Sequence, residues 1–162
     1  MTNSSPLKLL IFGGSGVLGT AIAEKFKTHN YKVTYGVRSV TNPVDQFLLP
    51  VTDGPVPELL KGELFDAVVF AQGANNNDSV INHAPDELTR LFQANVSFIT
   101  DTTKALMQHN LIKQKGKIVI LSSFWEQITR QEKMSYTITK AAVGGLVRSM
   151  AVDLGNAKGI LV

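Results

Sequence analysis

The sequence of 162 residues contains no cysteine. This absence excludes a disulfide framework, a thiolate metal site and a thiol nucleophile, and it fits a cytoplasmic location. No apolar run approaches the ~20 residues that span a bilayer, and residues 1–7 lack the basic and apolar stretches of a secretory signal. We therefore expect no contact with a membrane.

Histidine is scarce, and charge of one sign does not dominate the sequence. The three histidines lie far apart, so we expect no metal site. The net charge is +3, and the tightest basic group is Lys113, Lys115 and Lys117. Because no aromatic residue is interleaved with these lysines, a solvated loop before a strand is favoured over a nucleic-acid patch. We expect no nucleic-acid partner.

The sequence does have an alternation of short apolar runs with longer stretches of helical period. This alternation predicts an α/β fold of the Rossmann type, with a doubly wound parallel sheet in a single domain over residues 1–162. The expected strands cover residues 7–12, 31–37, 46–49, 67–71 and 117–121, and a further strand opens at 160–162. The expected helices cover residues 17–28, 85–109 and 134–155, with a short helix near 58–61.

A glycine-rich turn joins the first expected strand to the first expected helix. Glycine permits a tight turn and a close approach of the backbone to a pyrophosphate, while a helix N-terminus attracts anions. A plain turn is the competing interpretation, but the position directly after a buried strand favours dinucleotide binding. The residues expected to contact the cofactor in this turn are Gly13, Ser15, Gly16, Val17, Leu18 and Gly19.

Arg38 and Ser39 directly follow the second expected strand. A carboxylate at this place would accept hydrogen bonds from the ribose hydroxyls, whereas a guanidinium pairs with a 2′-phosphate. The alternative is an ordinary surface arginine. The pair predicts a preference for NADP(H) over NAD(H).

Tyr136 and Lys140 lie four residues apart in the last expected helix, which places them on one helix face. A free phenol is a poor base near neutral pH, but a neighbouring ammonium stabilises the phenolate. Tyr136 is therefore a candidate acid/base for a carbonyl or alcohol oxygen. Any helix can carry this pair by chance, so the spacing alone is weak evidence.

Two further segments support this interpretation. Ser122 and Ser123 end the apolar run before this helix, at the sheet edge where ligands bind. Ser123 is the candidate for orienting a substrate oxygen, and a hydroxyl pair that merely ends a strand is the alternative. Asn95 lies inside an expected helix, an unfavourable place for asparagine, and its apolar neighbours indicate an inward position.

The order of these motifs over residues 7–162 resembles the short-chain dehydrogenase/reductase family. The resemblance implies that Tyr136 is the acid/base, that Lys140 tunes it, and that Ser123 polarises the substrate oxygen. It also implies that Asn95 holds a water linking the lysine to solvent, and that Gly73 lines the cofactor site. Tyr136 and Lys140 would contact the cofactor as well.

Three segments depart from the family pattern. Val17 stands where many members have the middle glycine of the loop, and Pro50 stands where an aspartate often contacts adenine. Residues 70–72 read Phe-Ala-Gln instead of the usual Asn-Asn-Ala before Gly73. This last segment therefore supports the fold more than the function.

Family members usually run to about 250 residues, so the resemblance implies that the substrate lid and the last helix and strand are missing. We expect either a truncated form or part of a longer product. The helices over 85–109 and 134–155 resemble the pair through which family members associate, which implies a homodimer or homotetramer.

Together the motifs favour an NADP(H)-dependent oxidoreductase that reduces a small-molecule carbonyl substrate or oxidises the corresponding alcohol. Two alternatives stay open on the same fold: a non-catalytic dinucleotide-binding or sensing protein, and an inactive fragment. Turnover separates the first function from the second, and dinucleotide binding separates the second from the third.

Overall fold

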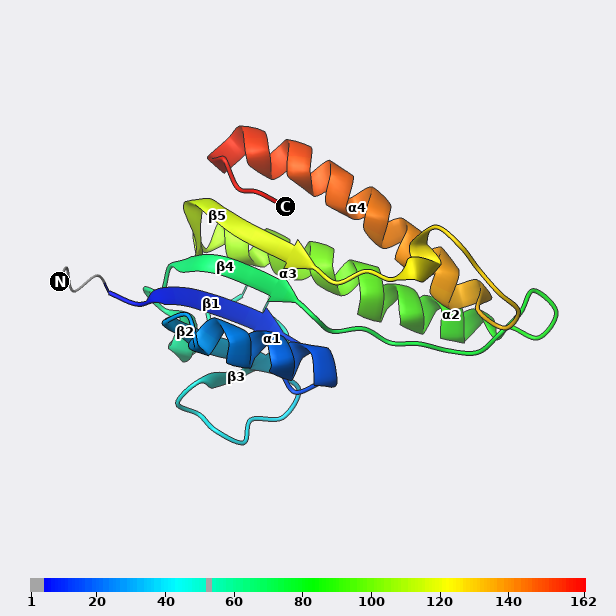
Figure 1. Ribbon diagram of the computed structural model, residues 1–162, viewed down its shortest axis with the longest axis horizontal. Helices are drawn as coiled ribbons and strands as arrows, with labels where there is room; N and C mark the ends of the chain where they lie inside the picture. Colours follow the sequence, from blue (N-terminus) through cyan, green and yellow to red (C-terminus); the bar gives the residue numbers. More distant parts are fainter. Residues whose placement is uncertain (1–4, 52–53) are drawn as a thin grey trace.

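Figure 1 presents the computed structural model, which describes residues 5–51 and 54–162. Five strands form one parallel sheet in the order β3-β2-β1-β4-β5. The chain adds strands first to one side of β1 and then to the other, which confirms the expected doubly wound α/β fold. The strands are β1 (Leu7–Phe12), β2 (Tyr31–Val37), β3 (Gln46–Leu48), β4 (Phe65–Phe70) and β5 (Ile112–Ile120).

Helices cover both faces of the sheet (Figure 1). One face carries α1, and the opposite face carries α3 and α4. The helices are α1 (Val17–Lys27), α2 (Pro85–Phe92), α3 (Phe98–Gln108) and α4 (Met134–Lys158). A π-helical turn, η2 (Gln93–Ser97), joins α2 to α3, and 3-10 turns lie at η1 (Glu58–Leu60) and η3 (Phe124–Glu126).

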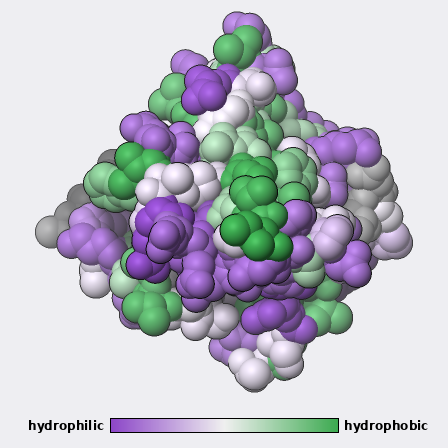
Figure 2. Space-filling view, turned by 90° about the vertical axis from the view of Figure 1, so that its right-hand side faces the viewer, coloured by the Kyte–Doolittle hydropathy of each residue, from purple (hydrophilic) through white to green (hydrophobic). Residues whose placement is uncertain are grey.

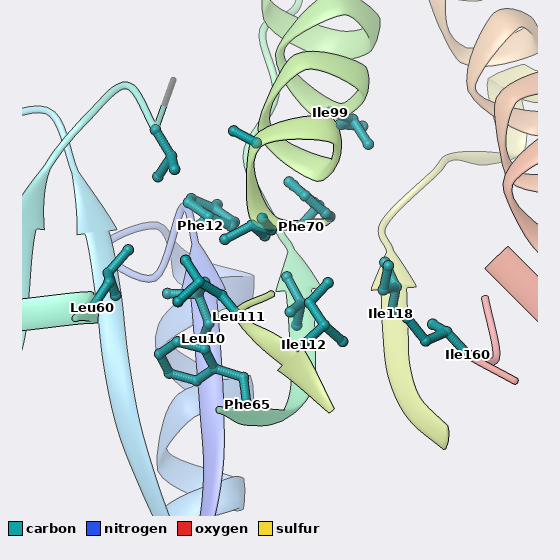
Figure 3. Close-up of a cluster of buried hydrophobic side chains, with 14 of the residues drawn as sticks. Leu10, Phe12, Leu60, Phe65, Phe70, Ile99, Leu111, Ile112, Ile118 and Ile160 are labelled. Atoms are coloured by element: carbon teal, nitrogen blue, oxygen red, sulfur yellow. The ribbon is translucent and has the colours of Figure 1, made fainter. Parts of the chain in front are cut away.

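The central strand β1 is buried on both faces because its apolar residues point alternately to the two helical layers. Leu9 and Ile11 pack in the cluster under α1, whereas Leu10 and Phe12 pack in the cluster under α3 and α4. The ring of Phe12 stacks on that of Phe70 of β4, with centroids 5.0 Å apart. Figure 3 labels both side chains in this core. Burying each such side chain contributes about 1.5–3 kcal/mol, so this strand is a rigid support for the turn that follows it.

The loop expected before the strand, at Lys113 and Lys115, is an incorrect prediction, because β5 begins at Ile112 and contains both lysines. Lys117 lies in the strand, as expected. The first half of β5 is irregular: its register against β4 shifts, and Lys115 has a φ of 59°. Lys113 Nζ donates a hydrogen bond of 2.7 Å to Asp66 Oδ1 on β4. The basic group thus belongs to the sheet, and part of its charge is paired within it.

The expected strand opening at residues 160–162 is present as a single parallel bridge between Lys117 and Leu161. The Ile118 N–H donates to the Leu161 carbonyl at 2.8 Å, and the Leu161 N–H donates to the Gly116 carbonyl at 3.0 Å. The polypeptide therefore begins a sixth position in the sheet, beside β5.

Membrane spans and metal clusters are both absent from the described residues. None of the helices in residues 5–51 and 54–162 is long and apolar enough to cross a membrane. No group of three or more histidine, aspartate or glutamate side chains in these ranges is placed to hold a metal ion. Residues 1–4, part of the stretch searched for a secretory signal, lie outside the described ranges.

Candidate active site

The candidate residues gather where the parallel strands end, at the right-hand side of Figure 1. The glycine turn follows β1, residues 73–78 follow β4, and the serines follow β5. Figure 2 views this end of the molecule directly and shows a few hydrophobic side chains set among hydrophilic ones. Ligands of open parallel sheets bind at this edge, outside the carboxyl ends of the strands.

The glycine turn is held tightly against the backbone that follows β4. Gly13 has a φ of +77°, and a Cβ there would lie 2.5 Å from the backbone nitrogen of Gln72. A Cβ on Gly19 would lie 2.1 Å from the Gly13 carbonyl oxygen. Both distances are too short for any side chain, so only glycine allows this path of the backbone.

The start of α1 exposes groups that a bound ligand can use. Gly16 is the N-cap residue, and no side chain caps this helix end. Ser15 and Gly16 are exposed, and the apolar side chains of Val17 and Leu18 are 89% and 64% exposed. Free N–H groups beside exposed apolar surface suit a ligand that has both a phosphate and flat rings.

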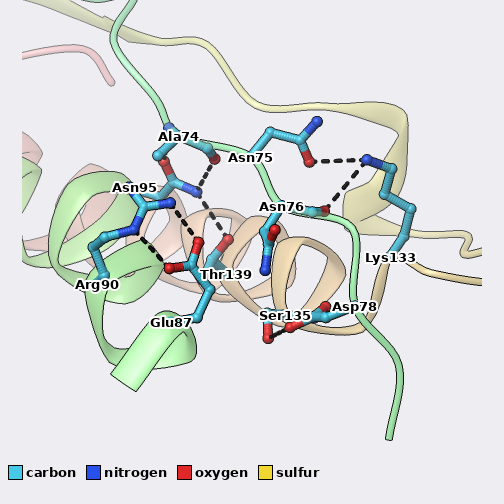
Figure 4. Close-up of polar contacts among 10 residues, drawn as sticks. All are labelled: Ala74, Asn75, Asn76, Asp78, Glu87, Arg90, Asn95, Lys133, Ser135 and Thr139. Carbon is cyan, nitrogen blue, oxygen red and sulfur yellow. Dashed lines mark hydrogen bonds and ion pairs between the residues drawn. The ribbon is translucent and has the colours of Figure 1, made fainter. Parts of the chain in front are cut away.

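Asn95 is almost completely buried, in the π-helical turn η2. Its Oδ1 accepts a hydrogen bond of 2.7 Å from the Ala74 N–H, and its Nδ2 donates to the Ala74 carbonyl at 2.9 Å. Nδ2 also donates to Thr139 Oγ1 on α4 at 3.0 Å, as Figure 4 shows. The inward position expected for Asn95 is confirmed, and its polar side chain ties the loop after β4 to α4.

Gly73 lies between Asn95 and Lys140. A Cβ at this position would be 3.3 Å from Asn95 Oδ1 and 3.9 Å from Lys140 Nζ. Gly73 itself is exposed. The structure thus brings Gly73, Asn95 and Lys140 together, and the exposed Gly73 leaves the space beside the other two side chains open.

Tyr136 and Lys140 share one face of α4, as their spacing predicts. Lys140 Nζ lies 5.7 Å from the centroid of the Tyr136 ring and donates a hydrogen bond of 3.1 Å to the Leu121 carbonyl. Burial lowers the pKa of Lys140 below its ordinary value, and the Glu126 carboxylate opposes this shift. Thr139, between them, donates to the Tyr136 carbonyl and accepts from Asn95.

Ser123 begins the 3-10 turn after β5. Its Oγ accepts a weak hydrogen bond of 3.3 Å from the Trp125 N–H, and the residue is half-buried. Ser122 differs, because its hydroxyl donates to Glu126 Oε2 at 2.6 Å. The adjacent Phe124 is 85% exposed, so it is available to line a substrate site.

Arg38 and Ser39 lie apart from this group, just after β2, and both are exposed. Their strand, β2, contacts the glycine turn by the Tyr35 ring. A Cβ on Gly14 would lie 2.5 Å from the Cδ1 atom of this ring. The structure therefore places Arg38 and Ser39 near the glycine turn, and Gly73, Tyr136 and Lys140 in a separate group with Asn95.

Two residues of this edge escaped the sequence interpretation. Lys133, three residues before Tyr136, has its Nζ 5.7 Å from the centroid of the Tyr136 ring. Gln72 has its side-chain Oε1 and Nε2 both buried without a hydrogen-bond partner among the described residues. The sequence could have indicated Lys133, because it lies three residues before Tyr136 and so shares a helix face with it. It could have indicated Gln72 because a glutamine at this place before Gly73 is unusual.

The residues present suit a dinucleotide on two observations. A Cβ on Gly13 or Gly19 would collide with backbone, which leaves a bare peptide surface at a helix N-terminus. Gln72, whose backbone lies against Gly13, has a buried carboxamide with an unused donor and acceptor among the described residues. Buried polar groups are normally paired, so such an amide is a site for a ligand hydrogen bond.

Comparison with known proteins gives the family. A family model described as enoyl-(acyl carrier protein) reductase matches residues 61–162, more than half of the chain. The chain is 33% identical over 87 residues to gluconate 5-dehydrogenase of Gluconobacter oxydans, covering 50% of this chain and 34% of that protein. It is 27% identical over 171 residues to 3alpha-hydroxysteroid dehydrogenase of Mediterraneibacter gnavus, covering 90% of this chain and 67% of that enzyme.

A solved structure shares the fold. The F98L/F202L mutant of a short-chain dehydrogenase/reductase from Serratia marcescens aligns with a TM-score of 0.80 at 21% identity, over 96% of this chain and 74% of the mutant. The chain therefore spans between about a third and three quarters of the length of these relatives. The match of the family model and the parallel sheet together place this chain in the short-chain dehydrogenase/reductase family.

Proposed function

We propose that this chain carries the cofactor-binding and acid/base residues of an NADP(H)-dependent oxidoreductase that interconverts a small carbonyl compound and its alcohol. One observation carries the proposal: Asn95, Gly73 and Lys140 meet at the sheet edge, with Tyr136 beside Lys140. A buried lysine beside a tyrosine, at the place where parallel sheets bind ligands, suits proton transfer to a substrate oxygen.

The proposed mechanism assigns one task to each side chain. When bound, NADP(H) supplies or accepts the hydride at the substrate carbon. Ser123 Oγ donates a hydrogen bond to the substrate oxygen and so polarises its bond to carbon. In reduction Tyr136 gives its phenolic proton to that oxygen, and in oxidation it takes the proton back. The Lys140 ammonium stabilises the intervening phenolate.

Asn95 supports this arrangement by position. Its amide joins Ala74, directly after Gly73, to Thr139, which in turn contacts the Tyr136 backbone. We assign Asn95 the role of holding these two segments, and the water that returns a proton to Tyr136 by way of Lys140. A site held by paired groups loses little energy in reorganising during the reaction.

The proposed cofactor residues divide by the part of the dinucleotide that they contact. The turn from Gly13 to Gly19 receives the pyrophosphate at its free N–H groups. The exposed Arg38 guanidinium and the Ser39 hydroxyl receive a 2′-phosphate, which is the reason for expecting NADP(H) rather than NAD(H). The unpaired Gln72 amide is a further hydrogen-bonding group for this ligand.

A non-catalytic dinucleotide-binding protein is the second candidate. It is favoured by Ser123, because in the part of the chain that the structure describes its Oγ is hydrogen-bonded to the Trp125 backbone N–H and not to Tyr136. Association through the α2–α3 and α4 helices, as a homodimer or homotetramer, is compatible with either function.

Tyr136→Phe tests the proposal. The variant should bind NADPH within a few-fold of the unchanged chain, measured by fluorescence titration, because the phenol hydroxyl is only one of many contacts. It should lose turnover of any carbonyl substrate found by screening with NADPH, because the transferable proton is gone. Unchanged turnover would refute the role of Tyr136, and NADPH binding without turnover in the unchanged chain would support the second candidate.

A further inference from the structure

Lys133 is a buried lysine at the start of α4, and the mechanism above does not use it. It is only 5% exposed. Its Nζ donates to Asn75 Oδ1 at 3.0 Å, to the Asn76 carbonyl at 3.4 Å and to Asn77 Oδ1 at 2.5 Å. Figure 4 draws the first two of these bonds. All three partners are neutral oxygens, and no carboxylate of the described residues pairs with this ammonium.

The three oxygens hold the Lys133 ammonium in place but do not neutralise its charge. Three hydrogen bonds satisfy the donors of an ammonium, but a buried charge that lacks a counter-ion is costly. The cost falls when a negative charge forms nearby. Lys133 Nζ lies 5.7 Å from the centroid of the Tyr136 ring, the same distance as Lys140 Nζ. Tyr136 is thus within cation–π range of two ammonium groups.

Two carboxylates also lie near this part of the molecule. Glu126, on η3, acts on Lys140 and is hydrogen-bonded by the Ser122 hydroxyl. Asp78 is buried and is engaged by the backbone N–H and the hydroxyl of Ser135. Both carboxylates accept from neutral donors and keep their negative charge. Because these charges are the same with and without Lys133, a change at Lys133 alone reports its own effect on the ring.

We propose that Lys133 is a second cation for Tyr136: its ammonium stabilises the phenolate together with Lys140. Lys133 is a positioning residue, because it acts through Tyr136, and its importance for catalysis rests on the proposed function. The Asn75–Asn77 oxygens fix the ammonium in place, so its field on the ring does not depend on a flexible side chain.

A purely structural role for Lys133 is the competing explanation, since its bonds tie residues 75–77 to α4. Two other ties already hold that loop. Ala74 is bound by Asn95, and Asp78 is bound by Ser135 and by the Met134 N–H, which donates to the Asp78 carbonyl at 3.1 Å. Loss of the Ser135 hydroxyl therefore loosens the same loop without changing the charge near the ring.

The experiment measures deprotonation of Tyr136 directly, without substrate. The chain has three tyrosines, so subtracting the ultraviolet titration of Tyr136→Phe from that of the unchanged chain isolates the Tyr136 phenolate signal. Lys133→Met and Lys133→Gln remove the charge, Lys133→Arg keeps it, and Ser135→Ala is the matched control. Thermal unfolding of each variant verifies that it is folded over the titrated range.

Neutralising Lys133 should raise the midpoint of this signal by about one to two pH units, the Coulomb effect of one charge 5.7 Å from the ring centroid in an effective dielectric of about 20 to 40. Lys133→Arg and Ser135→Ala should stay near the unchanged midpoint. An unchanged midpoint in both neutral variants, or an equal shift in Ser135→Ala, would overturn the proposal. Because turnover plays no part, failure of Tyr136 as the acid/base would appear separately, in the activity of Tyr136→Phe.

Discussion

Replacing Asn95 with alanine should destabilise the fold more than most polar substitutions. The Asn95 side chain makes three hydrogen bonds of 2.7 to 3.0 Å, two to the backbone of Ala74 and one to Thr139. Each partner that is left buried and unpaired costs about 1–3 kcal/mol. Ala74 is only half-buried, so water can replace part of what its backbone loses. We therefore expect Asn95→Ala to lower the free energy of unfolding by about 2–4 kcal/mol.

Thermal and chemical unfolding measure this cost. For a domain of this size each 1 kcal/mol lowers Tm by about 2–4 °C, so the expected drop is roughly 5–15 °C. Thr139→Val is the matched comparison: at nearly constant volume it removes the hydrogen bond from Asn95 and the one that Thr139 donates to the Tyr136 carbonyl, and it should cost about 1–2 kcal/mol. Hydrogen exchange at the Ala74 N–H should accelerate in Asn95→Ala but not in Thr139→Val. A cost below 1 kcal/mol with unchanged Ala74 exchange would refute the role of Asn95 as a tie between loop and helix.

Two further predictions concern charge. Arg38→Asp should weaken NADPH binding at least tenfold more than NADH binding in fluorescence titrations, because only NADPH carries the phosphate that a guanidinium pairs with; equal losses would remove the case for a 2′-phosphate contact. At Asp66, burial raises the pKa, but hydrogen bonds from Lys113 and the Lys8 N–H outweigh it and hold that pKa below its ordinary value. Lys113→Met should therefore lower the free energy of unfolding in urea by about 0.5–1 kcal/mol at pH 7. This loss should vanish as the pH falls below about 4 and the Asp66 carboxyl is protonated. Lys61→Met, which removes an exposed ion pair with Glu58, should change the free energy of unfolding little at either pH.

The sequence predicted β1, β2 and the start of α4 at the residues where the structure has them. Apolar runs buried on both faces, with glycine at their ends, define such strands from local information alone. The end of α4 was predicted three residues too early, at Gly155. The helix continues to Lys158 and ends at Gly159, whose φ of +64° is the left-handed conformation that closes a helix.

The misplaced start of β5 has a different cause. Lysines at alternate positions predict a solvated loop, yet Lys113 pairs with Asp66, 47 residues earlier, and this segment extends the sheet. The loop over 75–77 that surrounds Lys133 is likewise brought in from 56 to 58 residues away. Contacts at such separations leave no periodic trace, so a reading of local patterns does not find them. Asn95 was the exception because a polar residue inside an apolar helical stretch is visible locally.

The loop after β4 positions both the glycine beside Lys140 and the oxygens that surround Lys133. Gly73 at its start borders Asn95 and Lys140, Asn95 fixes Ala74 to η2, and Lys133 and Ser135 fix residues 75–78 to α4, which carries Tyr136 and Lys140. A shift of this loop would therefore move the glycine that borders Lys140 and, through the Asn75–Asn77 oxygens, the second ammonium near the phenol. Hydrogen bonds suit this task better than apolar packing, because they fix direction as well as distance. Burying these polar groups costs desolvation energy, but their directional hydrogen bonds restrict the site to a single geometry.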